Sequence, residues 1–359
     1  LLDLHMGEAA ALAWEEHPDG ALVELDLPRG GSALVVSGPK APAGKAHPTR
    51  RTETVLEAGE WKAARRGPNA LCLDYCDLTV LGEVHKDLFV THANRLAWQL
   101  HGHDRDLWDR GVQVGTMYLD LEFDAHSGFE TTWRFQVAKA SVDALRIPGS
   151  VRLAIENPQI YSVTLNGKAV DVASGERWLD ECIKAADCSA ALVAGENVIR
   201  IAARPFQPLC EIDRIYLVGE FASRPAKPGW EIEAPRPLAL GDWVKQGLSM
   251  HLGTVVYKAS VELGQAGAVE VRLGAWEGAC AAVRLAGQER VVYLRPFVAR
   301  FDDVAAGEHE VEVEVFGTLR NVMGPHFDPN LRFCAGPPHW DAAPAGPVDG
   351  ERYVLLPYG

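Results

Sequence analysis

The sequence predicts an all-β protein made of tandem β-sandwiches, and three observations support this. Short runs rich in Val, Ile, Tyr and Thr recur along the chain, and Gly, Asn and Pro separate them, as expected of antiparallel strands joined by turns. Helical spacing is convincing in one segment alone, residues 85–103, where Leu88, Leu96 and Leu100 recur near the helical period. Finally, the pattern of residues 131–205 returns in the same order in residues 254–317.

Residues 1–50 are interpreted as the end of a truncated β domain followed by a linker. Residues 21–36 resemble a hairpin, with two apolar runs on either side of Pro-Arg-Gly-Gly. Residues 38–50 are rich in Pro, Gly and Lys, which is typical of a linker. The chain opens on Leu1 and lacks the basic and apolar regions of a signal peptide, so we expect a fragment of a longer protein.

Residues 51–222 are predicted to form the first β-sandwich, with one short helix. Asn166-Gly167 lies between two β-rich runs, and both residue types tolerate the positive φ of a tight hairpin turn. Gly195-Glu196-Asn197 sets up a further strand over 198–202.

Residues 223–359 are predicted to form the second β-sandwich, with a closing C-terminal strand in RYVLLPYG. A Pro-rich segment, 222–236, marks the junction. Beyond it, Ala-Gly replaces Asn-Gly at the corresponding turn, and Val311, Val313 and Val315 alternate with glutamates. Such alternation predicts a sheet with one solvated face. The repeat favours two consecutive jelly-roll-like sandwiches.

Composition narrows the function classes. The formal net charge of −14 argues against a nucleic-acid-binding protein, which needs a basic face, and is compatible with neutral ligands such as sugars. No apolar run is long enough to span a bilayer, so no membrane partner is expected. The seven cysteines match no zinc pattern and lie mostly in apolar runs, which indicates buried thiols and a cytoplasmic location. A disulfide between Cys182 and Cys188 is the alternative.

Carbohydrate binding needs an aromatic surface for the apolar face of a sugar ring, with polar groups beside it for the hydroxyls. Three clusters have that composition. They are Trp276 with Glu277, Trp178 with Asn157, and a tail group of Asn321, His326, His339 and Trp340. For each cluster, packing between a loop and a sandwich is the alternative interpretation.

Glycoside hydrolysis needs two carboxylates that face each other across the scissile bond. Glu156, Glu277, Asp180 and Glu181 lie near predicted strand ends, where a sandwich could form a site. Solvated or turn-stabilising carboxylates explain them equally well. No nucleophile motif or phosphate-binding glycine loop is present in the sequence.

Several segments carry a family resemblance. They include LDLPRGGSALVV, VRLAIENPQIYSVTLNGK, EIDRIYLVGEF, WVKQGLSMHLGTVVYKASV and the terminal YVLLPYG. In this order they resemble the C-terminal half of large bacterial glycoside hydrolases, the α-L-rhamnosidase-like and family 2-like enzymes. In those enzymes, galactose-binding-type jelly-roll domains follow the catalytic barrel.

The resemblance implies that the catalytic acid and base lie on an upstream barrel, which would be this region's partner within the same protein. No residue is therefore assigned a catalytic role. The resemblance also implies a carbohydrate ligand, and a structural Ca²⁺ is possible in such domains. Two alternatives stay open: a stand-alone lectin-like protein or separate structural subunit, and an enzyme whose site, with Glu156 or Glu277, lies inside one sandwich.

Overall fold

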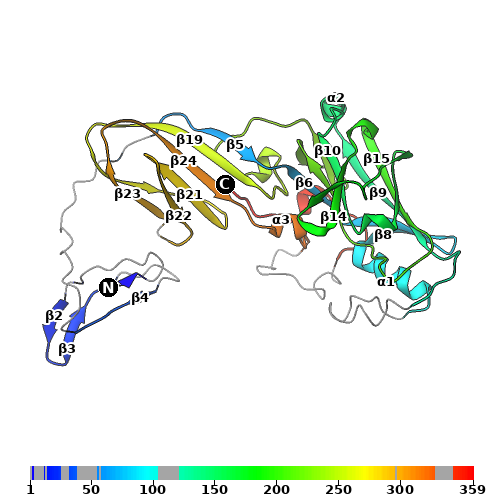
Figure 1. Ribbon diagram of the computed structural model, residues 1–359, viewed down its shortest axis with the longest axis horizontal. Coiled ribbons are helices and arrows are strands. Elements are labelled where there is room, and N and C mark those ends of the chain that lie inside the picture. The colour runs from blue at the N-terminus through cyan, green and yellow to red at the C-terminus, as the bar shows by residue number, and fades with distance from the viewer. Residues whose placement is uncertain are drawn as a thin grey trace. The chain divides into compact units, whose positions relative to one another are not determined.

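The computed structural model describes residues 2–3, 12, 14–25, 32–38, 55, 58–103, 121–295, 297–327 and 343–359. Contacts divide the chain into two compact units. Unit 1 comprises Leu1–Lys62 and Tyr257–Val315, and unit 2 comprises Ala63–Val256 and Phe316–Gly359. Strands dominate both units (Figure 1), which confirms the predicted all-β class.

Unit 2 is built from two sheets. The first has the strand order β13-β14-β10-β16-β6, and all its pairings are antiparallel. Its strands are β6 (Asn69–Leu73), β10 (Val151–Glu156), β13 (Glu176–Trp178), β14 (Asp180–Asp187) and β16 (Ile215–Gly219).

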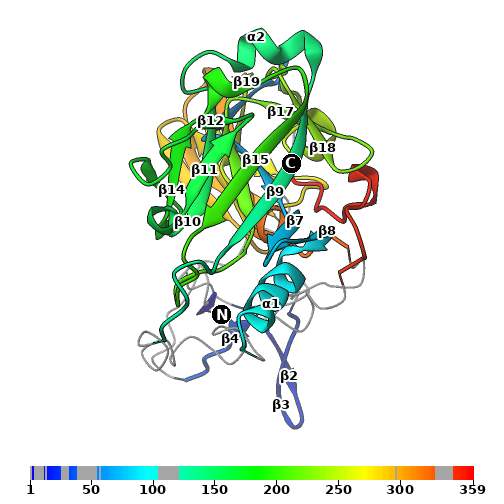
Figure 2. The ribbon, with the colours of Figure 1, turned by 90° about the vertical axis from the view of Figure 1, so that its right-hand side faces the viewer.

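The second sheet of unit 2 has the order β12-β11-β15-β9-β18-β17, and Figure 2 shows β11, β15 and β9 side by side. Strand β7 also pairs with β9, and β8 pairs with β7. The strands are β7 (Tyr75–Val80), β8 (Glu83–Phe89), β9 (Phe129–Val137), β11 (Ser162–Leu165), β12 (Lys168–Ala169), β15 (Gly195–Ala203), β17 (Ala222–Pro225) and β18 (Trp230–Glu233).

The two sheets of unit 2 share one hydrophobic core. Alternate residues of β9 and β10 point into it, among them Trp133 and Leu153, which are at most 1% exposed. This period-2 burial follows from the alternation of side chains along a strand. The core fixes the ends of the strands in space, and the candidate site lies at one of those ends.

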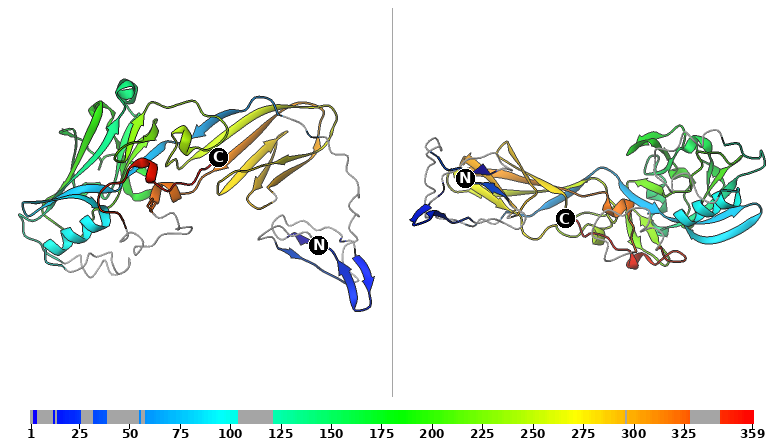
Figure 3. Two further views of the ribbon diagram at one scale, coloured as in Figure 1. Left: turned by 180° about the vertical axis from the view of Figure 1, so that it is seen from behind. Right: turned by 90° about the horizontal axis from the view of Figure 1, so that it is seen from below.

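The helix predicted over 85–103 is shorter in the structure. Strand β8 runs to Phe89, and helix α1 covers Val90–Leu100 (Figure 3). Residues 85–89 pair with β7 instead, because an alternating strand and an apolar helical stripe share several positions in so short a run. The remaining helical turns are brief: η2 (Lys139–Ser141), α2 (Val142–Leu145), η3 (Pro158–Ile160), η4 (Ser189–Ala191), η5 (Val244–Gln246), α3 (Arg320–Met323) and η6 (Gly350–Arg352).

Unit 1 contains most of the strand run β22-β21-β24-β19 and the separate pair β20-β23. Strand β5, which follows β19 in the same sheet, has Lys62 in unit 1 and its other residues in unit 2. Two further two-stranded pairs, β1 with β4 and β2 with β3, lie near the N-terminus. The strands are β1 (Leu2–Asp3), β2 (Trp14–His17), β3 (Gly20–Val23), β4 (Ala33–Leu34), β5 (Lys62–Arg66), β19 (Thr254–Leu263), β20 (Gly267–Arg272), β21 (Cys280–Leu285), β22 (Gln288–Val292), β23 (Val298–Val304) and β24 (Gly307–Phe316).

The predicted internal repeat reappears as a shared strand order. The run β22-β21-β24-β19 repeats the run β12-β11-β15-β9, and the pair β20-β23 corresponds to β10-β14. The tight turns correspond too. Asn166 and Gly167 have φ values of 51° and 76°, and Ala286 and Gly287 have 49° and 75°. Positive φ at both central residues defines the hairpin turn that matches strand twist.

Two strand predictions were wrong in detail. Strand β3 pairs with β2 across Pro18-Asp19, and so it does not form the hairpin predicted within residues 21–36. Residues 353–359, predicted to be a closing strand, join no sheet. They are held instead by hydrogen bonds in which Asn321 Nδ2 donates to Leu356 O at 2.9 Å and Trp243 N donates to Tyr358 O at 2.8 Å.

The boundary predicted after residue 222 falls inside the second sheet of unit 2. Strand β18 pairs in parallel with β9, so that Ile232 lies opposite Val137. Residues 316–359 also belong to unit 2. Whether the ranges 1–50, 51–222 and 223–359 are separate folding domains stays a prediction.

The described cysteines are all free, so the alternative of a Cys182–Cys188 disulfide was wrong. Cys72, Cys76, Cys188 and Cys210 are buried, as expected, whereas Cys182 is exposed. Burial raises the pKa of the Cys188 thiol to about 12, which keeps it protonated and unreactive at neutral pH.

Candidate functional site

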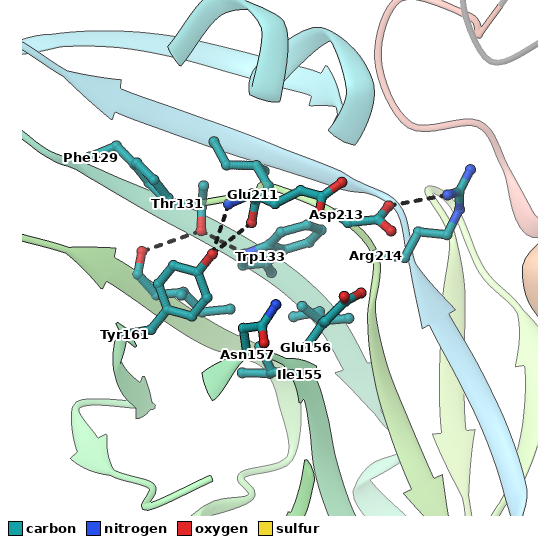
Figure 4. A pocket seen from close by; sticks show the side chains of 13 residues that line it. Phe129, Thr131, Trp133, Ile155, Glu156, Asn157, Tyr161, Glu211, Asp213 and Arg214 are labelled. Atoms are coloured by element: carbon teal, nitrogen blue, oxygen red, sulfur yellow. Dashed lines mark hydrogen bonds and ion pairs between the residues drawn. The ribbon is translucent and has the colours of Figure 1, made fainter. Parts of the chain in front are cut away.

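A pocket opens at one end of the unit 2 sandwich. There β10 and β15 end while β9 and β16 begin, because neighbouring strands in each sheet run antiparallel. Both sheets and the two loops that follow β10 and β15 contribute to its walls (Figure 4). The pocket is lined by Phe129, Thr131, Trp133, Ile155, Glu156, Asn157, Tyr161, Ile201, Glu211, Ile212, Asp213, Arg214 and Ile215.

Several polar groups of the pocket wall are already used by the fold. Trp133 Nε1 donates to Thr131 Oγ1 at 2.9 Å, and Thr131 Oγ1 donates to Ile201 O at 3.3 Å. Tyr161 Oη donates to Glu211 O at 2.9 Å and accepts from Glu211 N at 3.0 Å. These bonds fix both aromatic rings. Trp133 is buried behind the wall, whereas Tyr161 is partly exposed.

Glu156 and Asn157 line the pocket with polar side chains that are not engaged in hydrogen bonds within the described part of the protein. Neither carboxylate nor amide has a hydrogen-bond partner among the residues that the structure describes. Asn157 has a φ of 46°, and its backbone N donates to Cys182 O at 2.9 Å. This left-handed residue ends β10 and turns the chain into η3, which places both side chains at the pocket mouth.

The electrostatics of the pocket are dominated by carboxylates. Partial burial, and then the neighbouring Asp213 and Asp180 carboxylates, raise the pKa of Glu156 above its ordinary value. Asp213 forms an ion pair with Arg214, with Oδ1 3.2 Å from Nη1. The Arg214 guanidinium lies over the Phe89 ring, 5.5 Å from its centroid, and this packing keeps it under the pocket wall.

Of the residues predicted for carbohydrate binding, Asn157 lines this pocket. Trp178 does not: it is buried on β13 and packs against Tyr216, with ring centroids 5.0 Å apart. Trp276 and Glu277 lie in unit 1, between β20 and β21. Trp276 packs edge to face against Phe297 at 5.2 Å, and Glu277 is exposed beside it.

Asn321 and His326 do come together, but inside the protein. His326 Nε2 lies 2.8 Å from Asn321 O, and the His326 ring stacks on Tyr353 with centroids 5.1 Å apart. Both residues are at most 2% exposed. Their contacts hold the C-terminal segment, which is the packing alternative stated above. Trp340 and His339 lie outside the described residues.

Sequence reasoning missed Tyr161, Glu211 and Asp213 as pocket residues. Glu156 was noted as a carboxylate at a strand end, and the same reasoning applies to Asp213, which lies just before β16. The antiparallel pairing of β10 with β16 places these two ends together. Local pattern alone does not reveal that pairing, since about sixty residues separate the two positions.

No metal site can be recognised within the described ranges, where no three His, Cys, Asp or Glu side chains are grouped so as to hold an ion. The expected Ca²⁺ stays a prediction. Likewise, none of the helices in the described segments has the length and apolar character needed to cross a membrane.

Comparison with protein-family models found no match, and comparison with curated protein sequences found none either. Solved structures are similar in part. The β-D-mannosidase of Dictyoglomus thermophilum is 14% identical over 69% of this chain and 31% of its own, with a TM-score of 0.28.

Two further structures are similar at the same level. A GH2 β-galacturonidase of Eisenbergiella tayi is 12% identical over 70% of this chain and 37% of its own, with a TM-score of 0.23. A putative β-galactosidase of Bacteroides fragilis is 12% identical over 70% and 36%, with a TM-score of 0.23. This chain thus spans about a third of the length of these proteins. Scores this low carry no conclusion about its function.

Proposed function

We propose that this chain is a non-catalytic accessory region of a glycoside hydrolase, and that its unit 2 pocket binds carbohydrate. In this role it buttresses a catalytic barrel supplied elsewhere in the same protein and contributes part of the substrate surface. The motifs described above resemble α-L-rhamnosidase-like and family 2-like enzymes, and the repeated strand order fits the tandem jelly-roll domains of such proteins.

The observation that carries the proposal is the composition of the pocket. The partly exposed Tyr161 ring and the unused polar groups of Glu156 and Asn157 stand at its mouth, and the buried Phe129 ring lies behind them. A sugar presents an apolar face and a rim of hydroxyls, and these two kinds of surface match them.

Calorimetric titration of the 359-residue chain with rhamnose, galactose, mannose and their oligosaccharides tests the binding role. We expect saturable binding that Asn157→Ala weakens. Glu196→Gln is the control, because Glu196 is exposed and does not line the pocket, and it should leave binding unchanged. Failure of every sugar to bind would remove carbohydrate binding from the proposal.

A second candidate is an enzyme with its site in this pocket. One observation favours it: a carboxyl group with a raised pKa, Glu156, lies near a second carboxylate, Asp213, as in an acid and base pair. Aryl glycosides assayed with the isolated chain distinguish the two candidates. Turnover that disappears in Glu156→Gln, without loss of folding, would contradict the non-catalytic role.

The expected Ca²⁺ has its own test. If the ion is present and structural, chelation lowers the Tm of the chain and added Ca²⁺ restores it, because a ligand that binds only the folded state stabilises that state. An unchanged Tm contradicts the calcium prediction and leaves the accessory role standing.

A further inference from the structure

Strand β20 of unit 1 has one edge without a neighbouring strand, and the internal repeat shows what kind of element fits there. In unit 2, the corresponding strand β10 pairs with β14 on one side and with β16 on the other, both antiparallel. Within the described ranges, β20 pairs with β23 and with no second strand. The position that β16 occupies beside β10 therefore has no counterpart beside β20 in the described part of unit 1.

The side chains of β20 also lack the cover that a neighbouring strand gives. Val269 lies opposite Phe301 of β23, on the inner side of the pair. Val271 lies opposite Ala299 on the same side. Both β23 residues are at most 1% exposed, yet the two valines are partly exposed. In unit 2, the inward-facing Leu153 of β10 is fully buried. An additional strand beside β20 would complete the burial of its valines.

The free edge of β20 presents the backbone groups of Glu270 and Arg272. Leu273 N donates to Phe297 O at 3.0 Å, on the side of β23. In an antiparallel pair, alternate residues direct their N–H and C=O groups to opposite sides of the strand. Val271 therefore faces β23, as Leu273 does, whereas Glu270 and Arg272 direct their backbone groups to the free edge. Backbone groups at such an edge can pair with a strand of another chain.

The sequence of β20 is complementary to itself. When two copies of β20 lie antiparallel with Val271 opposite Val271, Glu270 of each copy lies opposite Arg272 of the other. Val269 then lies opposite Leu273 on the inner side. The backbone groups that pair are the ones that face the free edge, and charged residues meet charged residues because the two-fold axis keeps both faces matched.

Other symmetric registers fit less well. A two-fold axis at Glu270 or at Arg272 sets that charge against its own copy, and like charges directly opposite destabilise a strand pair. The charges needed for the register about Val271 are already held on one face. Glu270 Oε2 lies 2.7 Å from Arg272 Nη2 of the same strand, and Glu270 Oε1 lies 3.0 Å from Arg300 Nε.

We propose that unit 1 binds a second copy of this chain through β20, as an antiparallel β20–β20 pair with Val271 at the two-fold axis. Main-chain hydrogen bonds between the edges provide the affinity, and the two Glu270–Arg272 pairs select the register. An interface of one strand from each copy is small, so we expect a Kd on the order of 10–100 µM. This inference does not depend on the proposed carbohydrate binding.

Sedimentation velocity of the 359-residue chain tests the pairing, at concentrations well below and well above this Kd. We expect the native chain to dimerise. Glu270→Arg and Arg272→Glu should each weaken self-association by roughly tenfold or more, because two favourable charge pairs become repulsive. An equimolar mixture of the two variants should associate again, since opposite charges then face each other at both positions. Glu308→Arg is the control, because Glu308 is exposed on β24 and the change in charge is the same as in Glu270→Arg.

Hydrogen exchange of the native chain supplies a readout that needs no variant, and it decides if either variant fails to fold. The amide protons of Glu270 and Arg272 should exchange more slowly at high protein concentration, whereas that of Val271 should change less because it faces β23. A chain that stays monomeric, with exchange at both positions independent of concentration, overturns the proposal. Folded variants that each self-associate like the native chain, or that fail to associate when mixed, overturn it as well.

Discussion

The two units build the same four-stranded run with different side chains at its key positions. In unit 2 the hairpin β11-β12 turns at Asn166-Gly167, and in unit 1 the hairpin β21-β22 turns at Ala286-Gly287. The next corresponding position holds Asn197 in unit 2 and His309 in unit 1. The backbone is the same at the turns, so the side chains carry the difference.

In unit 2 the two asparagines lock the turn to the neighbouring strand. Asn166 Nδ2 donates to Asn197 Oδ1 at 2.8 Å, and Asn166 Oδ1 accepts from Val198 N at 2.9 Å. In unit 1, Ala286 adopts the same left-handed conformation with no side-chain amide to stabilise it, and this costs a residue with a Cβ about 1–2 kcal/mol. The comparison teaches that one turn geometry can be held by a polar network or by strand pairing alone.

The largest expected effect is at Asn197. This fully buried amide accepts from Val193 N and donates to Val193 O and Gly195 O, besides its bond with Asn166. Asn197→Ala leaves several of these groups buried without partners, and we expect the free energy of unfolding to fall by about 3 kcal/mol. Urea denaturation followed by circular dichroism measures it.

The matched control is His309→Ala in unit 1. His309 Nε2 lies 2.9 Å from Ala305 O at the surface, so its removal should change stability by less than about 0.5 kcal/mol. Equal effects of the two substitutions would show that the asparagine network adds nothing to the repeated fold.

A smaller and opposite pair of effects is expected at the turns. Asn166→Ala should destabilise the protein by about 1.5 kcal/mol, since it loses the network and gains left-handed strain. Ala286→Asn should stabilise it by about 0.5 kcal/mol, because Asn tolerates positive φ better. Hydrogen exchange of β11 and β21 measures both changes strand by strand. Ala286→Gly should relieve the same strain, because Gly also tolerates positive φ. If neither substitution at position 286 stabilises the protein, the strain argument is wrong.

Local pattern predicted those features that depend on a few adjacent residues. The Asn166-Gly167 turn, the alternation of Val311, Val313 and Val315 and the repeat itself all follow from short-range chemistry, and the three valines are indeed buried. Their glutamate face is less solvated than predicted. Glu314 is buried, and its Oε2 lies 2.9 Å from Arg284 Nη1 on the neighbouring strand.

The features that sequence could not predict are those made by distant segments. The parallel pairing of β18 with β9 joins residues almost a hundred positions apart, and the sequence pattern of neither segment indicates this pairing. The pocket likewise combines Thr131, Tyr161 and Asp213 from separate strands and loops. Asn157 was predicted as the polar partner of Trp178, and it lines the pocket without that ring. Trp178 and His326 have the right chemistry for a site but are used by the core.

The smallest expected effect is a dependence of stability on pH, and we expect it in unit 2. In unit 2, His251 is 1% exposed, with Nδ1 3.0 Å from Pro68 O, and burial lowers its pKa below the ordinary value. The unfolded chain therefore binds a proton more readily than the folded one. Stability should fall as the pH drops through about 6.5, the ordinary pKa of histidine, towards the lowered folded value.

Denaturation curves at several pH values measure this loss, and hydrogen exchange assigns it to strands of unit 2 rather than to β21 and β24. His251→Gln removes the titrating group, so the variant should lose less stability over the same interval even if it is less stable throughout. The exposed carboxylate of Asp187 has a lowered pKa, because the opposing effect of partial burial is outweighed by the hydrogen bonds from Ser189, and its own loss comes at a more acidic pH, below its ordinary range. If the free energy of unfolding of His251→Gln falls with pH near pH 6 as steeply as that of the native chain, the acid sensitivity comes from groups other than His251.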